Sequence, residues 1–372
     1  MNDYEKIVAD KWEEFQKDLK SPNILLLGQT GCGKSSLVNY LFGANIALTN
    51  DVYRGTIDFK YYKGKEYGTG VNIIDSRGYE YGDKDSYEKY MLSIRDEIEI
   101  RKKNPDQMVH LVWYAISEAS HRIEPMDINI LNELMKIPDI RHRVAVVYTK
   151  CDESSADGST TRIFDKIIRE EVDGNLPTFE TSTDEDLACD LDFNKLVQWS
   201  ANNIDDEDMK NAFIISQKTD LDAKKALVNK SIAGYMAAAA GVAATPIPFS
   251  DAALLTPIQI GMATHITRIY AMNNIGGLSK AILSQVIISN MGKSLAANII
   301  KLIPGAGTAV GAVVNAGVAS VLTGAIGRAI SEICYSYCQD VLAGKDVDIY
   351  HIFDAEIFSQ AVTAQLGKRI EH

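Results

Sequence analysis

Negative charge is nearly missing from one long region of the sequence, between Ala226 and Ile330. Asp251 is the only acidic residue there, whereas six positions are basic: Lys230, Arg268, Lys280, Lys293, Lys301 and Arg328. The whole chain of 372 residues has a net charge of −12, so its acidity is concentrated elsewhere. This separation of charge indicates two differently built halves. The overall negative charge also argues against a basic surface for nucleic acid, and no nucleic-acid partner is expected.

Cysteine is scarce, and its spacing is uninformative. Five cysteines occur, an odd number, and no two are spaced as CxxC: Cys32, Cys151, Cys189, Cys334 and Cys338. A long chain with this pattern is not built on a disulfide framework, and the spacing does not fit a zinc site. The first residues, Met1–Phe15, are acidic and amphipathic and do not resemble a secretory signal. The expected location is the cytoplasm.

Short apolar runs alternate with helical patterns over the first half of the chain. The runs typical of buried strands are Asn23–Leu27, Val71–Ile74, Met108–Ala115 and Val144–Tyr148. The helical stretches among them are Ser86–Lys102, Pro125–Met135 and Thr161–Val172. This alternation predicts an α/β domain with a mainly parallel sheet covered by helices on both faces.

Strand signals stop past about Leu196, and helical patterns continue to the end of the sequence. We therefore expect two domains. Residues 1–216 would form the α/β domain, with an N-terminal amphipathic helix from Asp3 to Leu19, and residues 217–372 an all-α domain rich in Ala and Gly. The length suits this division, because one domain usually takes on the order of 100–200 residues.

A glycine-rich turn follows the first apolar run and opens a helix. Its residues fit GxxxxGK[ST] without a mismatch and are Gly28, Gln29, Thr30, Gly31, Cys32, Gly33, Lys34 and Ser35, followed by Ser36. Backbone N–H groups of such a turn curl round phosphate oxygens, and the next helix presents its positive N-terminus. We expect Lys34 to reach the β- and γ-phosphates and the Ser35 hydroxyl to bind Mg²⁺. The turn therefore predicts a nucleotide-binding P-loop.

An Asp-x-x-Gly segment follows the second strand-like run. Asp75 is predicted to hold Mg²⁺ through water, and the N–H of Gly78 to contact the γ-phosphate. A further Mg²⁺ ligand should come from the loop upstream of this run, where Thr49 and Thr56 are both available. We favour Thr56, because it directly precedes a strand-like stretch.

A TKxD tetrapeptide, with Thr149, Lys150 and Asp152, directly follows the last buried run. A carboxylate there accepts hydrogen bonds from N1–H and the 2-amino group of guanine, whereas adenine would leave it unpaired. The pattern therefore predicts GTP and GDP as ligands rather than ATP. A second contact with the base should come from a later loop, with Ser182 and Ser200 as alternatives. We favour Ser182, because Ser200 falls within a helical pattern.

Together these motifs resemble the Era-like and septin-like branches of the translation-factor-related (TRAFAC-class) GTPases. The stretch Gly28–Asn39 looks especially like the GxTGxGKSSLxN of immunity-related and avirulence-induced GTPases, and the resemblance extends over about Ile24–Asn203. It implies a P-loop G domain that binds GTP or GDP with Mg²⁺ and hydrolyses GTP. Lys34, Thr56 and Gly78 would then be the residues closest to the chemistry.

Two departures from the family pattern affect mechanism. Tyr79 stands where Ras-like proteins have a water-orienting Gln, and Gly31 stands where potassium-activated relatives have Asn. We therefore expect slow intrinsic hydrolysis without potassium activation. The missing group would come from a partner or from a second copy in a homodimer across the nucleotide face. His121 and Arg122, in a polar loop, are candidates for it, although a solvated loop is the simpler explanation for both.

Small apolar residues fill the second half of the sequence. Residues 246–252 (PIPFSDA) and 303–308 (IPGAGT) resemble the helical module of YcjF-type proteins, which implies architecture more than activity. The apolar segments fit the core of a water-soluble bundle, or helices that contact an anionic membrane. Ile232–Ala244 is too short to cross a bilayer, whereas Pro304–Gly327 is long enough. We favour the soluble bundle, with peripheral membrane contact as the alternative.

Three functions remain open at this point. The first is a GTP-hydrolysing switch whose helical domain transmits the nucleotide state to a partner or membrane. The second is a scaffold that binds GTP or GDP for stability and has negligible turnover. The third is a dynamin-like machine that acts on membranes.

Overall fold

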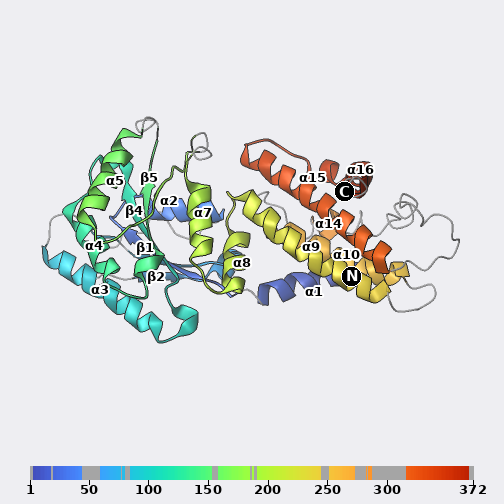
Figure 1. Cartoon of the computed structure of the whole chain (residues 1–372), viewed down its shortest axis with the longest axis horizontal. Helices are drawn as coiled ribbons and strands as arrows, with labels where there is room; N and C mark the ends of the chain where they lie inside the picture. Colours follow the sequence, from blue (N-terminus) through green and yellow to red (C-terminus); the bar gives the residue numbers. More distant parts are fainter. Residues whose placement is uncertain are drawn as a thin grey trace. The chain divides into compact units, whose positions relative to one another are not determined.

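The chain forms two compact units (Figure 1). The computed structural model describes residues 3–17, 20–43, 59–76, 78–79, 84–152, 158–184, 187, 191–243, 251–272, 282, 284–286 and 316–367. Leu19–Asp220 form the first unit, and Met1–Asp18 join Leu221–His372 in the second. The first unit is α/β and the second is helical, so the predicted fold class, an α/β domain followed by an all-α region, is confirmed.

A six-stranded sheet organises the α/β unit, in the order β2-β3-β1-β4-β5-β6. Its strands are β1 (Asn23–Gly28), β2 (Phe59–Tyr62), β3 (Asn72–Ser76), β4 (Leu111–Ser117), β5 (Val144–Thr149) and β6 (Thr178–Glu180). The edge strand β2 pairs antiparallel with β3, and the other neighbours pair in parallel. Every residue of β1 and β5 is buried, because helices cover both faces of the sheet.

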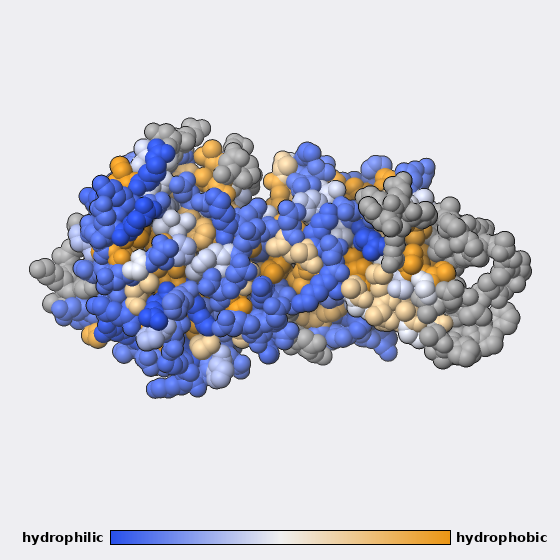
Figure 2. Space-filling view, in the orientation of Figure 1, coloured by the Kyte–Doolittle hydropathy of each residue, from blue (hydrophilic) through white to orange (hydrophobic). Residues whose placement is uncertain are grey.

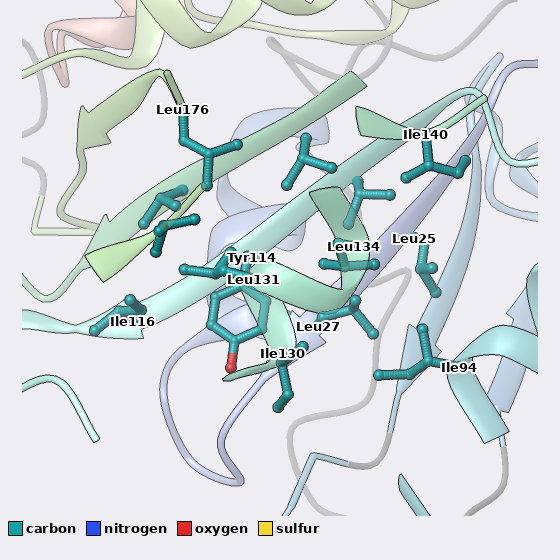
Figure 3. Packing of buried hydrophobic residues seen from close by; sticks show 14 of the residues in the cluster. Leu25, Leu27, Ile94, Tyr114, Ile116, Ile130, Leu131, Leu134, Ile140 and Leu176 are labelled. Atoms are coloured by element: carbon teal, nitrogen blue, oxygen red, sulfur yellow. The ribbon is translucent and has the colours of Figure 1, made fainter. Parts of the chain in front are cut away.

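Alternate residues of β1 face two separate hydrophobic clusters. Leu25 and Leu27 belong to a cluster with α3, α4 and α5, part of which is drawn in Figure 3, while Ile24 and Leu26 pack with α2, α7 and α8. The helices are α2 (Lys34–Phe42), α3 (Lys84–Lys102), α4 (Pro125–Met135), α5 (Ser159–Glu171), α7 (Phe193–Asn202) and α8 (Glu207–Ser216). The two-residue period of a strand thus places one apolar layer on each face.

Strand register brings the loops of the site together. Gly28 at the end of β1 lies opposite Ala115 of β4, and Ser117 of β4 lies opposite Thr149 at the end of β5. Asp75 of β3 lies opposite Leu26 on the other side of β1. Because these strands are parallel, the loops that follow them meet at one edge of the sheet, where open α/β sheets bind ligands.

The helical unit contains α1 (Asp3–Lys17), α9 (Leu221–Ala243), α10 (Asp251–Ile269), α14 (Ala316–Leu342), α15 (Ile349–Ile352) and α16 (Ala355–Gly367). Close packing depends on small residues. A Cβ added to Gly324 of α14 would lie 2.6 Å from the sulfur of Met236 on α9. Figure 2 shows light orange residues over α9, where Ala233, Ala237 and Ala238 are exposed. The apolar stretch Pro304–Gly327, predicted to be long enough to cross a bilayer, lies outside the described residues as far as position 315.

The expected division into residues 1–216 and 217–372 placed the N-terminal helix with the α/β domain. The structure places this helix in the other unit. α1 belongs to the helical unit, where Phe15 stacks on His265 of α10 with ring centroids 4.1 Å apart. The guanidinium of Arg268, also on α10, lies 5.8 Å from the ring of Trp12. The buried Val8 and Trp12 form the apolar stripe of α1. An amphipathic stripe predicts that a helix is half-buried, but it does not identify the surface that buries it.

Candidate functional site

The glycine-rich turn between β1 and α2 has the backbone shape of a phosphate-binding loop. Gly28, Gly31 and Gly33 have φ angles of +130°, +78° and +99°, a region that other residues rarely adopt. A Cβ at Gly28 would lie 2.2 Å from the carbonyl oxygen of Ala115, so β4 also requires glycine here. Gly33 is the N-cap of α2 and offers no side chain to the first amides of the helix. A helix N-terminus without a side-chain cap is suited to bind an anion in front of the helix.

Lys34 is folded over this loop. Its Nζ donates to the carbonyl oxygens of Gly28 and Gln29, each at 3.0 Å, and the side chain is only 7% exposed. Ser35 follows in the first turn of α2 and is partly exposed. The loop thus holds an ammonium group and a hydroxyl where phosphate oxygens and a metal ion would need them.

Asp75, at the end of β3, supplies a carboxylate to the same place. Burial raises the pKa of Asp75, and the charge of Lys34 partly opposes this shift. Its Oδ1 is buried and has no hydrogen-bond partner among the described residues. A hard divalent cation or its water would satisfy this oxygen, so the residues present fit Mg²⁺. Thr56, the other predicted ligand, lies outside the described residues, as does the alternative Thr49.

Gly78 lies directly against the P-loop. Its φ is +78°, and a Cβ added there would lie 2.6 Å from the amide nitrogen of Thr30 and 2.8 Å from the carbonyl oxygen of Gly28. The next residue, Tyr79, accepts a hydrogen bond on its carbonyl oxygen from the Thr30 N–H at 3.3 Å. The Asp-x-x-Gly segment is therefore in contact with the loop that would surround the phosphates.

The side chain of Tyr79 is buried in the core and is only 2% exposed. Its hydroxyl donates to Oδ1 of Asp127 in α4, and the Tyr114 hydroxyl donates to the same oxygen at 2.7 Å. The ring also meets Tyr90 edge-on, with centroids 5.8 Å apart. Tyr79 therefore cannot orient an attacking water in this conformation. No local sequence pattern predicted these contacts, because Asp127 lies 48 residues from Tyr79 and 13 residues from Tyr114.

The TKxD segment is bonded to the P-loop. The Thr149 hydroxyl donates to the carbonyl oxygen of Cys32, and Lys150, with a φ of +56°, donates from Nζ to the carbonyl oxygen of Gly31 at 2.8 Å. The exposed Asp152 follows, and its Oδ1 accepts a hydrogen bond from the buried Ser182 hydroxyl at 2.7 Å. These bonds place the predicted base-binding carboxylate and hydroxyl side by side.

Ser200, the rejected alternative for the base contact, lies inside α7, as its helical pattern predicted. It is fully buried, and its hydroxyl accepts a hydrogen bond from Nε1 of Trp113 at 3.2 Å. The serine belongs to the core between α7 and the sheet.

The loop after β4 carries a carboxylate that the sequence did not single out. Glu118 has no exposed surface, and neither of its side-chain oxygens has a hydrogen-bond partner among the described residues. Nδ1 of His121 lies 3.8 Å from Oε1 of Glu118, and the His121 side chain is 61% exposed. Arg122 pairs through Nε with Oε1 of Glu124 at 2.5 Å, and Glu124 is the N-cap of α4. His121 thus lies in the surface loop after β4, at the same edge of the sheet as the P-loop.

Comparison with known proteins agrees with this geometry. A family model described as "50S ribosome-binding GTPase" matches residues 23–150. The α/β unit has the fold and the motifs of a P-loop G domain. Neuronal-specific septin-3 of Mus musculus is 27% identical over 202 residues, which cover 48% of this chain and 56% of that protein. Septin-9 of Rattus norvegicus is 30% identical over 145 residues, which cover 32% of this chain and 25% of that protein. The chain therefore spans about half, or less, of the length of these relatives.

Among solved structures, Toc33 from Arabidopsis thaliana in complex with Mg²⁺ and GMPPNP aligns with 49% of this chain and 79% of its own. The two sequences are 18% identical, and the TM-score is 0.32. Similarity at this level supports no conclusion about activity or partners. The assignment of the domain therefore depends on its motifs, its strand order and the family match.

Proposed function

We propose that this protein binds GTP and GDP with Mg²⁺ and hydrolyses GTP slowly, as a switch. The observation that carries the proposal is the bonding of the TKxD segment to the P-loop through Thr149 and Lys150. A base held at Asp152 would then have its phosphates over the P-loop. Because the carboxylate accepts from N1–H and the 2-amino group, it selects guanine over adenine.

Each residue at the phosphate end has a distinct role. Lys34 would exchange its loop carbonyl partners for β- and γ-phosphate oxygens, which are stronger acceptors for an ammonium group. Ser35, Asp75 and Thr56 would hold Mg²⁺, which draws negative charge away from the phosphate oxygens. The Gly78 N–H would contact the γ-phosphate and so report its presence.

Slow turnover is expected because Tyr79, whose side chain is buried, stands where Ras-like proteins have the Gln that orients the attacking water. The exposed His121 could supply a polar group to a second copy across the nucleotide face. A homodimer of this kind would make the rate of hydrolysis depend on protein concentration. In the proposed switch, the helical unit transmits the nucleotide state to a partner or to a membrane.

Contact with an anionic membrane is the second candidate role. Within the described part of the chain, one helical segment, Gly317–Leu342, is long and apolar enough to cross a bilayer, and 61% of its most apolar window is buried. Core helices of soluble proteins can be equally long and apolar, so this helix is weak support for a membrane role. The six basic residues between Ala226 and Ile330 would favour anionic lipid. A cytoplasmic location, with peripheral membrane contact, is part of this proposal.

A multiple-turnover GTPase assay over a range of protein concentrations tests the proposal. A specific rate that rises with concentration supports a switch completed by self-association. A rate that stays at zero at all concentrations, with tight binding of GTP and GDP, would favour the nucleotide-stabilised scaffold. A rate that rises only when anionic liposomes are added would favour a dynamin-like membrane function. No binding of either nucleotide would exclude all three.

A further inference from the structure

Tyr79 is hydrogen-bonded both to the P-loop and to α4. Its carbonyl oxygen accepts from the Thr30 N–H of the P-loop at 3.3 Å, and its hydroxyl donates to Oδ1 of Asp127 in α4. The side chain is almost fully buried, so water does not replace the second bond. A single residue thus joins the phosphate loop to the first turn of a helix on the sheet face.

Asp127 depends on the donors around it. The residue is 4% exposed; its Oδ1 accepts from both Tyr79 and Tyr114, and its Oδ2 accepts from the Glu124 N–H at 3.0 Å. Burial raises the pKa of Asp127, and the two phenol hydroxyls oppose that shift. Removing one phenol leaves a buried carboxylate with fewer donors, which costs more than an exposed hydrogen bond. Movement of the Tyr79 side chain away from α4 is therefore unfavourable.

The position of Gly78 and Tyr79 matters for the third phosphate. Gly78 is packed on the P-loop so closely that a Cβ would lie within 3.0 Å of Thr30 and Gly28 atoms. The Tyr79 carbonyl oxygen accepts a hydrogen bond from the Thr30 N–H, so Tyr79 is also bonded to the loop that would surround the phosphates. A γ-phosphate needs room and donors beside this loop, whereas a diphosphate ends one phosphate earlier. The γ-phosphate therefore requires these two residues to rearrange.

We propose that the Tyr79–Asp127 hydrogen bond sets the preference of the site between diphosphate and triphosphate. The bond favours the packed position of Gly78 and Tyr79, so it favours GDP and opposes GTP. Only an interaction that differs between the two bound states can change their relative affinities, and this bond differs because the γ-phosphate displaces its backbone. The inference rests on the proposed function, because it concerns the same nucleotide site.

The test compares two variants that each remove one hydroxyl from the same carboxylate oxygen. Tyr79→Phe removes the donor on the Asp-x-x-Gly segment, and Tyr114→Phe removes the donor on β4. Affinities for GDP and for a non-hydrolysable GTP analogue are measured by calorimetry with Mg²⁺. In Tyr79→Phe, the affinity for the analogue relative to GDP should rise about tenfold, which corresponds to about 1.4 kcal/mol. In Tyr114→Phe this ratio should stay within about twofold of the wild-type value.

Thermal melting of both variants separates a structural effect from a specific one. Both should melt below the wild type, because each leaves Asp127 with one phenol. An unchanged ratio in Tyr79→Phe, a change of the opposite sign, or an equal change in Tyr114→Phe would overturn the inference. If wild-type protein bound neither nucleotide, the proposed function itself would fail, which is a different outcome.

A measurement on the wild-type protein keeps the inference testable if Tyr79→Phe does not fold. The amides of Asp127 and Ile128 donate to the carbonyl oxygen of Glu124 at the start of α4. Their hydrogen exchange should be faster with the GTP analogue than with GDP, because the triphosphate weakens the link to Asp127. Equal exchange rates in the two states would overturn the inference without involving a mutation.

Discussion

Replacement of Asp152 by Asn changes the predicted base contact without changing the size of the side chain. The carboxylate is exposed at the end of β5 and accepts a hydrogen bond from Ser182 at 2.7 Å, so it is already oriented before a base arrives. A hydrogen bond to a charged group contributes about 1.5–3 kcal/mol, and an exposed site gives the lower value. Two such bonds to guanine amount to about 3 kcal/mol, so Asp152→Asn should weaken GTP binding about a hundredfold.

The same substitution should improve the binding of xanthine nucleotides, because the carboxamide can donate to the 2-oxo group that replaces the 2-amino group. Competition of GTP, XTP and ATP against a fluorescent guanine nucleotide measures all three affinities. Asp184→Asn is the matched control, since it removes an equal charge from the loop that contains Ser182 and should leave base preference unchanged. The reasoning would be refuted if Asp152→Asn kept the wild-type affinity for GTP, or if the wild type bound ATP as tightly as GTP.

Three further predictions concern the α/β unit. Lys34→Ala should weaken nucleotide binding at least a hundredfold while circular dichroism stays unchanged, because its partners in the structure are two loop carbonyls; full retention of GTPase activity would contradict the site. Asp75→Asn should reduce the dependence of nucleotide release on Mg²⁺ concentration about tenfold or more, and an unaltered Mg²⁺ titration would argue against a ligand role. His110 accepts the Asn23 N–H on Nδ1, and burial lowers its pKa from 6.5 to about 4. Between these two pH values only the unfolded chain takes up this proton, so the free energy of unfolding should be highest above pH 6.5 and fall by up to about 3 kcal/mol toward pH 4. Urea unfolding should show that the wild type loses more stability than His110→Gln between pH 7.5 and 4.5. An equal loss in the two proteins would refute the assignment.

Local patterns in the sequence identified most residues of the candidate site. A P-loop is encoded by glycine spacing within eight residues, so Gly28 and Lys34 could be placed from the sequence alone. The helical periodicity around Ser200 correctly predicted that it lies within a helix. The two-residue and 3.6-residue periods likewise predicted the strands and helices of the α/β unit to within about two residues at most ends.

Contacts between distant segments could not be predicted in this way. Asp127 receives hydroxyls from positions 48 and 13 residues away, and no local pattern distinguishes its carboxylate from an ordinary helix cap. Glu118 is polar in a polar loop, yet the fold buries it completely, because residues 118–120 are in contact with β5. The stripe of α1 showed which side is buried, but the helix that covers it, α10, lies more than 200 residues away in the sequence.

The membership of α1 in the helical unit makes the GTPase domain an insertion within a discontinuous domain. Residues 19–220 are contiguous, so this domain can complete its fold as it leaves the ribosome, whereas α1 must wait for α10 to be synthesised. Until then the apolar side of α1 that carries Val8 and Trp12 lacks its final partner. A fragment that starts at Leu221 lacks this helix and exposes the complementary surface of α10. Separate expression of the helical unit therefore calls for residues 3–17 joined by a linker to residue 221, and a simple truncation is expected to aggregate.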